Sequence, residues 1–148
     1  MHIHETENNK SNKRYKPLVD RLFWIISIPT AVLMLASTAL AVFAHPPMLV
    51  FMSLMTLWVF YLLVSSLFGY VELRDGTLFI KYGLILKKEI PYSKIRGVVK
   101  ERRFYSESMI SLKNAFEHIN IKYNTFDVTT VSVVGNDELI SELNARLL

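Results

Sequence analysis

The chain has 148 residues, a mean hydropathy of +0.28 and a formal net charge of +4, and only 20% of its residues are charged. The fifty residues 22–71 contain no Asp, Glu, Lys or Arg. Soluble domains carry about 25% charged residues, so this distribution argues against a single water-soluble globule and against a disordered chain. It indicates a long apolar segment followed by one small domain.

Several classes of chemistry are excluded by what the sequence lacks. It has no cysteine, which excludes disulfide frameworks, thiolate metal sites and cysteine nucleophiles. It has no glycine-rich phosphate loop and no HExxH motif, so we predict no cofactor and no metal site, and we expect none at the N-terminal pair His2 and His4. The net charge is +2 in residues 1–21 and +2 in residues 72–148, a balance too mild to indicate a nucleic-acid partner.

The uncharged stretch is long enough for two membrane-spanning helices and a turn. A helix needs about 20 apolar residues to cross the hydrocarbon core of a bilayer. His45-Pro46-Pro47 interrupts the stretch, because proline lacks an amide hydrogen and disfavours helix in the residue before it. We therefore predict a transmembrane helical hairpin over residues 22–70, with helices at about 22–44 and 48–69. Small residues at helical spacing are candidates for the contact face of the first helix: Ser27, Ala31, Thr38 and Ala41.

Basic residues flank this hairpin but are missing from its turn. Five precede the first helix, and Arg74, Lys81, Lys87 and Lys88 follow the second. The positive-inside rule then predicts a multi-pass protein of the cytoplasmic membrane with both termini in the cytoplasm. Residues 1–21 are polar without apolar periodicity, so we expect a disordered cytoplasmic N-terminus. A cleaved signal peptide is the competing interpretation, but its apolar region is typically about 7–15 residues long.

Residues 71–148 are predicted to form a cytoplasmic domain of short strands. Alternation of apolar and polar residues indicates half-buried strands, Asp75-Gly76 and Gly83 supply turns, and Pro91 marks a strand start or edge. The predicted strands are 70–74, 77–82, 84–90, one from about 95, one around 109–112, 118–123 and 128–134.

The domain is predicted to end in an amphipathic helix. Asn136 and Asp137 follow Gly135 at its start, where capping side chains and negative charge are favourable. Its apolar stripe consists of Leu139, Ile140, Leu143 and Leu147. A bent sheet with one helix over an open end satisfies this order of elements.

The order of elements and several local segments resemble bacterial pleckstrin-homology (PH) domains, and in particular the YyaB-like PH domain family of small bacterial membrane proteins. The segments that carry the resemblance are Ile90-Pro91-Tyr92-Ser93-Lys94-Ile95, Ser111-Leu112 ahead of Ile119-Asn120-Ile121, and the Asp137-Glu138-Leu139 helix start. The resemblance implies an α+β protein: a two-helix transmembrane hairpin, then a PH-like antiparallel β-barrel or sandwich capped by a C-terminal helix. It does not choose a ligand, because PH-like folds bind lipids, peptides or proteins.

The best candidate binding residues are basic and lie close together in the sequence. Lys94, Arg96, Lys100 and Arg102 share one parity and would point to one face of a regular strand, with Arg103 beside them. A short tether from Tyr70 would hold this face near the inner leaflet, where each cation adds about 1 kcal/mol of attraction to anionic lipid. The face contacts either anionic headgroups or an acidic partner, or it is simply a solvated strand face.

We therefore predict a binding or scaffolding module at the inner leaflet that recognises a protein partner or anionic lipid headgroups. Two alternatives belong to other classes. One is an immunity or stress-protection protein that shields the membrane from a peptide toxin. The other is a membrane-associated enzyme, and its candidate catalytic residues would be Ser111, His118 and Asp127. We expect His118 to lie at the surface or on an edge strand. We predict no enzyme activity, because no turn motif exposes a nucleophile.

Overall fold

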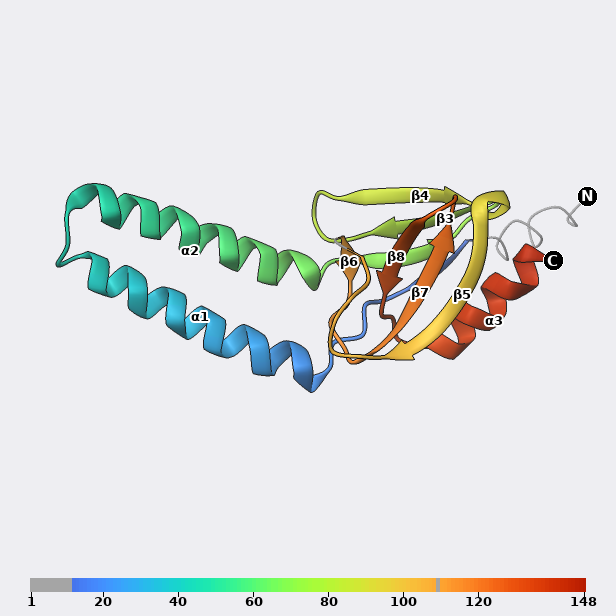
Figure 1. Cartoon of the computed structure of the whole chain (residues 1–148), viewed down its shortest axis with the longest axis horizontal. Helices are drawn as coiled ribbons and strands as arrows, with labels where there is room; N and C mark the ends of the chain where they lie inside the picture. Colours follow the sequence, from blue (N-terminus) through green and yellow to red (C-terminus); the bar gives the residue numbers. More distant parts are fainter. Residues whose placement is uncertain (1–11, 109) are drawn as a thin grey trace, which may run out of the picture.

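In the computed structural model, which describes residues 12–108 and 110–148, two long antiparallel helices extend from one end of a β-rich domain (Figure 1). Helix α1 is Arg21–Ala41 and helix α2 is Pro46–Ser66. The side chain of Asp20 caps α1, and Pro46 and Pro47 occupy the first turn of α2, where missing amide hydrogens cost nothing. Both predicted helices are present, each ending three residues earlier than expected.

The two helices contact each other through small and hydroxyl-bearing residues. The Thr38 and Thr56 hydroxyls are 2.7 Å apart, and Ser27 and Ala41 are buried. This agrees with the small-residue face that the sequence predicts on α1. The large apolar side chains of both helices point outward instead, and most of them are exposed.

The first sheet contains a strand that the sequence analysis missed. Its order is β1 (Lys13–Tyr15), β2 (Tyr70–Leu73), β3 (Thr77–Lys81) and β4 (Lys87–Pro91), with all pairs antiparallel. The prediction that residues 1–21 are disordered is therefore wrong for β1, which pairs with β2 and buries Tyr15 in the core. It is also wrong for residues 16–20, because the Leu18 amide donates to the Ser132 carbonyl and the Asp20 amide to the Asn114 carbonyl. Residues 1–11, which include His2 and His4, lie outside the described residues.

The second sheet follows a short 3₁₀ turn, η1 (Tyr92–Lys94). Its order is β5 (Ile95–Arg102), β7 (Glu117–Tyr123), β8 (Asp127–Val131) and β6 (Ser111–Leu112). All pairs are antiparallel except β6 with β8, which is parallel. The resemblance implies a purely antiparallel sandwich, and the structure departs from it at this pair.

Helix α3 (Asn136–Leu147) packs against β5, β7 and η1 and closes the core between the sheets. Leu139 and Leu143 are fully buried, and Ile140 and Leu147 pack at the margin of the core, which confirms the predicted stripe. Gly135 precedes the helix with a φ of 88°, a conformation that side chains with a Cβ rarely adopt.

The domain contacts the start of α1 and the end of α2. The backbone oxygen of Asn114 accepts a hydrogen bond from the amide of Asp20 at 3.0 Å, and its side-chain amide donates to the Ser66 carbonyl at 3.0 Å. A Cβ on Gly69 would overlap Leu112 and lie 2.6 Å from the carbonyl oxygen of Lys81. The link between α2 and β2 is therefore packed tightly against the sheet.

Replacing Tyr15 by alanine tests whether β1 belongs to the folded domain. Removing a buried aromatic ring costs about 3–5 kcal/mol, so we expect the thermal unfolding midpoint of the full chain in detergent to fall by several degrees. The exposed neighbour Lys16 supplies the control Lys16→Ala, which should leave the midpoint unchanged. Equal midpoints for the two variants would contradict the assignment of β1.

Replacing Gly69 by alanine tests the close packing below α2. Because the added methyl group meets backbone that cannot move aside, we expect a loss of about 1–3 kcal/mol in the free energy of unfolding. Gly97→Ala is the matched control, since nothing lies within 4 Å of a Cβ at that position. Chemical denaturation of both variants would show the difference, and a neutral Gly69→Ala would refute the packing argument.

Candidate binding surface

The tip between β3 and β4 lies against α2 at the end of the domain from which the helices extend, here called the helix-side end (Figure 1). The amide of Leu84 donates a hydrogen bond to the Ser65 hydroxyl at 2.9 Å, and Gly83 lies so close to Ser65 that a Cβ there would overlap its hydroxyl oxygen. Beyond this contact the tip is exposed: Leu84 is 45% exposed, Ile85 71% and Leu86 56%. Three adjacent aliphatic side chains thus face outward beside the helix.

Three lysines surround the base of this tip. Lys81 and Lys87 face each other across the β3–β4 pair, and Lys88 follows directly. The ammonium group of Lys81 lies 5.8 Å from the ring centre of Tyr70, and that of Lys88 lies 4.6 Å from the ring centre of Tyr123. None of the three forms a salt bridge with a carboxylate in the described part of the chain. Like charges directly across a sheet disfavour folding, so an anion here would relieve the repulsion.

A seam without backbone pairing separates the two sheets at β4 and β6, which are both edge strands. Two side-chain contacts bridge it: the hydroxyls of Tyr82 and Thr129 bond to each other, and Lys88 donates to the Tyr123 hydroxyl. Between them is a cavity of about 410 Å³. Burial raises the pKa of the Tyr82 hydroxyl above its usual value.

The predicted basic face on β5 does not exist as one surface. A bulge between Ile95 and Gly97 inserts Arg96 as an extra residue, so the strand alternation changes there. Lys94 lies in η1 and Arg96 donates to the Thr125 carbonyl at 3.0 Å, both at the end of the domain far from the helices. Lys100 and Arg102 lie after the bulge, toward the helix-side end of the strand. The shared parity of the four residues in the sequence was therefore misleading.

Two of the predicted basic residues are held by carboxylates. Lys100 contacts Glu117 at 2.6 Å and Asp137 at 2.8 Å, and these acidic partners raise the pKa of its ammonium group. Arg103 lies 3.5 Å from Glu101 and 3.6 Å from Glu107. Their charges are already matched within the domain, which leaves less attraction for an external anion than at the three lysines of the tip.

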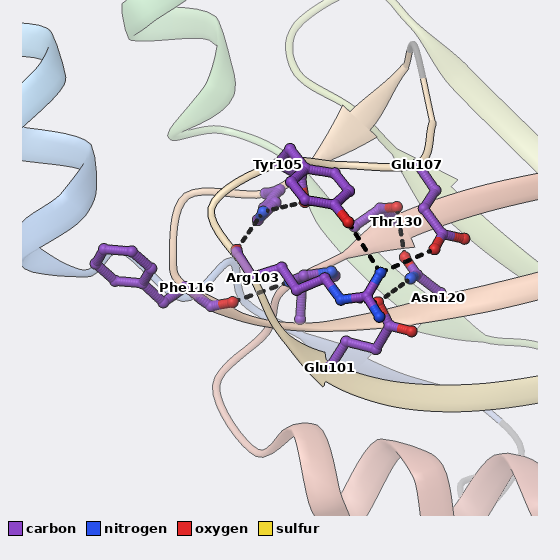
Figure 2. Close-up of polar contacts among 9 residues, drawn as sticks. Glu101, Arg103, Tyr105, Glu107, Phe116, Asn120 and Thr130 are labelled. Atoms are coloured by element: carbon purple, nitrogen blue, oxygen red, sulfur yellow. Dashed lines mark hydrogen bonds and ion pairs between the residues drawn. The ribbon is translucent and has the colours of Figure 1, made fainter.

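Arg103 belongs to a network that fixes the connection between β5 and β6 over the outer face of the second sheet (Figure 2). Its guanidinium donates to the Tyr105 hydroxyl at 3.1 Å, and Lys113 donates to the carbonyls of Arg103 and Tyr105 at 2.7 Å each. Partial burial lowers the pKa of Lys113. Below it, Asn120 donates to Glu101 and accepts from Thr130. The network shapes a loop in which Arg103 is paired with carboxylates and Lys113 with backbone carbonyls.

The residues considered for catalysis do not meet. His118 is fully buried rather than at the surface, and its Nδ1 lies 2.9 Å from the Phe116 carbonyl oxygen. Asp127 pairs with Tyr123, which lies five residues after His118 on β7. At 3.4 Å per residue, this separates Asp127 from His118 by about 17 Å along the strand. The described residues also contain no cluster of three or more histidine, aspartate or glutamate side chains that could hold a metal ion.

Sequence reasoning missed the importance of the β3–β4 tip because it assigned residues 84–90 to one strand. The strand begins only at Lys87, and Leu84, Ile85 and Leu86 belong to the connection. A signal was present: three consecutive apolar residues cannot alternate, so they do not fit a strand with one buried face. Lysines on both sides of that run mark it further.

The comparisons with known proteins agree with this architecture. Residues 69–147 match the family described as the bacterial PH domain. No curated protein and no solved structure gives a significant match to the chain. The matched segment begins at the close contact below α2 and ends with α3, so it includes both the lysine-flanked tip and the seam, and the chain belongs to the bacterial PH domain family.

Proposed function

We propose that this protein is a membrane-anchored binding module, in which α1 and α2 cross the cytoplasmic membrane and the PH domain contacts anionic lipid headgroups of the inner leaflet. The observation that carries the proposal is the β3–β4 tip, where exposed aliphatic side chains lie beside α2 and lysines lie directly behind them. An apolar tip with cations at its base matches the order of hydrocarbon and phosphate at a bilayer surface.

The helices support the membrane part of the proposal. Each has 21 residues, or about 31 Å at 1.5 Å per residue, which matches a hydrocarbon core of about 30 Å. Only 6% of the apolar window of α1 and 11% of that of α2 is buried inside the structure. A core helix of a soluble protein would be mostly covered, whereas lipid would cover these side chains from outside.

The distribution of charge supports the orientation. Basic residues lie before α1 and after α2, and the turn between the helices has none. The positive-inside rule then places both termini and the domain in the cytoplasm. Two apolar helices ahead of one PH domain also form the arrangement of the YyaB-like family that the sequence resembles.

The contact with the membrane would come from a fixed domain rather than a mobile one. Asn114 bonds to both helix ends, and the tip lies against Ser65. Trp58 and Tyr61 of α2 line a common groove with Ile85, and Trp58 lies eight residues, about 12 Å, before the end of the helix. If α2 spans the bilayer, Ile85 is then immersed in it.

A protein partner is the second candidate, and one observation favours it. Phe126 is 93% exposed in the turn between β7 and β8, and it lines a groove of about 470 Å³ with Arg96 and Lys122. Figure 1 shows the turn between β7 and β8 away from the long helices, where a cytoplasmic partner could reach it. In either case the proposed role is binding rather than catalysis.

Reporter fusions test the orientation. Green fluorescent protein fused after Leu148 should fluoresce in bacterial cells, and alkaline phosphatase at the same position should stay inactive because it matures only outside the cytoplasm. Phosphatase inserted between His45 and Pro46 should be active and serves as the control. Phosphatase activity after Leu148 would overturn the proposed topology.

Cysteine labelling tests immersion of the tip, since the natural sequence has no cysteine. Ile85→Cys and Phe126→Cys both place a thiol at a position that the protein leaves exposed. Maleimides react with the thiolate, which does not form in hydrocarbon, so a membrane-impermeant maleimide should label Ile85→Cys at least tenfold more slowly in lipid nanodiscs. Both should react fully in denaturant. Similar rates in nanodiscs would mean that the domain stands away from the bilayer.

A further inference from the structure

Three connected cavities run from the side of α2 into the seam between the sheets, and we call them together the seam groove. The first, about 590 Å³, is lined by α2 and the tip: Leu54, Leu57, Trp58, Tyr61, Leu62, Ile85 and Leu86. The second, about 230 Å³, shares Tyr61, Leu62 and Leu86 with the first. The third is the seam cavity of about 410 Å³, which shares Tyr82, Leu86 and Ile110 with the second.

The chemistry of the lining changes in one direction along the seam groove. The residues that line the first cavity are apolar, apart from the single polar atom on each of the Trp58 and Tyr61 rings. The second adds the serines Ser65, Ser66 and Ser111. The third adds Lys87, Lys88, Tyr82 and Tyr123, and the Lys88 ammonium group donates to the Tyr123 hydroxyl. The order from α2 inward is therefore apolar, hydroxyl-bearing, then cationic.

We propose that the seam groove binds one anionic phospholipid of the inner leaflet, with an acyl chain along α2 and the phosphate at Lys87 and Lys88. A phospholipid has the same order of parts: hydrocarbon chain, polar ester region and phosphate. The inference rests on the proposed membrane crossing, because only then does the apolar cavity open into the hydrocarbon region while the lysines lie beyond the end of α2. Cavities of several hundred Å³ with a few placed polar groups are typical of ligand sites.

The charges select an anionic lipid over a zwitterionic one. No carboxylate of the described residues lines any of the three cavities. Lys88 gives one of its three donors to the Tyr123 hydroxyl, which leaves two for a phosphate oxygen. Lys87 also lines the third cavity and forms no salt bridge with a carboxylate of the described residues, so its charge is available to the same phosphate.

The edges of the sheets explain why the site lies at the seam. β4 and β6 do not pair with each other, so unpaired backbone groups and space remain between them. The two side-chain bridges across the seam hold the sheets at a fixed separation. Leu86, just before β4, and Ile110, just before β6, line the second cavity together with Ser65 and Ser66 at the end of α2, where a lipid of the inner leaflet could enter from the side.

Native mass spectrometry of the full-length protein tests the site. The protein is purified in a mild detergent, stripped of lipid and titrated with dioleoylphosphatidylglycerol or dioleoylphosphatidylcholine. We expect one phosphatidylglycerol per chain, with an apparent affinity at least tenfold above that for phosphatidylcholine. Equal retention of the two lipids would overturn the proposal.

Two pairs of variants locate the site. Lys87→Gln with Lys88→Gln removes the cations but keeps a donor for Tyr123, and should abolish the preference for phosphatidylglycerol. Lys16→Gln with Lys94→Gln removes the same charge at two exposed positions that line none of the three cavities, and should leave the lipid preference unchanged. Leu62→Trp fills the apolar cavity without a change of charge and should weaken binding at least tenfold, while Leu33→Trp on the exposed side of α1 should not. Equal losses in a variant and its control would refute the site.

The outcome separates this inference from the proposed function. If Ile85→Cys is protected in nanodiscs but no lipid is preferred, the membrane-anchored module stands and the lipid site is wrong. If Ile85→Cys reacts as fast as Phe126→Cys, the proposed function itself fails. The thermal unfolding midpoint of each variant, measured in the same detergent, establishes that it is folded before its lipid binding is compared.

Discussion

The other features of the structure depend on one constraint, which is the contact of the domain with the start of α1 and the end of α2. Asn114 joins the start of α1 to the end of α2, and Ser65 accepts a hydrogen bond from the backbone of the β3–β4 tip. Glycine at 83 permits the close approach, since any side chain there would overlap Ser65. The hydrogen bond to Ser65 sets the position of the tip along α2. With it, the groove between α2 and the tip becomes a permanent part of the fold.

Electrostatics divides the basic residues of the domain into two kinds. Lys100 and Arg103 are matched by nearby carboxylates, so their charges mainly stabilise the packing of α3 and of the loop after β5. Lys81, Lys87 and Lys88 have no such partners within the described residues and lie next to exposed aliphatic side chains. Each cation near an anionic surface contributes about 1 kcal/mol, so three together amount to about a hundredfold in affinity. A charge is available for binding only when the fold leaves it unmatched.

The long elements could be predicted from the sequence, and the short or irregular ones could not. The absence of charge and the two prolines located α1 and α2, and the stripe ending at Leu147 located α3, because many residues repeat the same pattern. β1 has three residues, too few to show a period of two, and only its pairing with β2 makes it a strand. One extra residue at Arg96 reversed the parity on which the basic face depended. The candidate site could not be predicted for a similar reason. Its β3–β4 tip is an irregular connection, and its role depends on its position against the end of α2.

The family match begins at residue 69, yet the folded unit begins earlier. β1 forms the edge of the first sheet, Tyr15 fills part of the core, and Lys13 bonds to Glu138 of α3. The chain then returns along the second sheet, where the Leu18 amide donates to the Ser132 carbonyl at 3.0 Å, before it enters α1. The helix pair is thus inserted between the first two strands of one sheet rather than attached in front of a complete domain. A fragment cut at the family boundary would lose an edge strand and expose the core, so the binding properties belong to the whole chain.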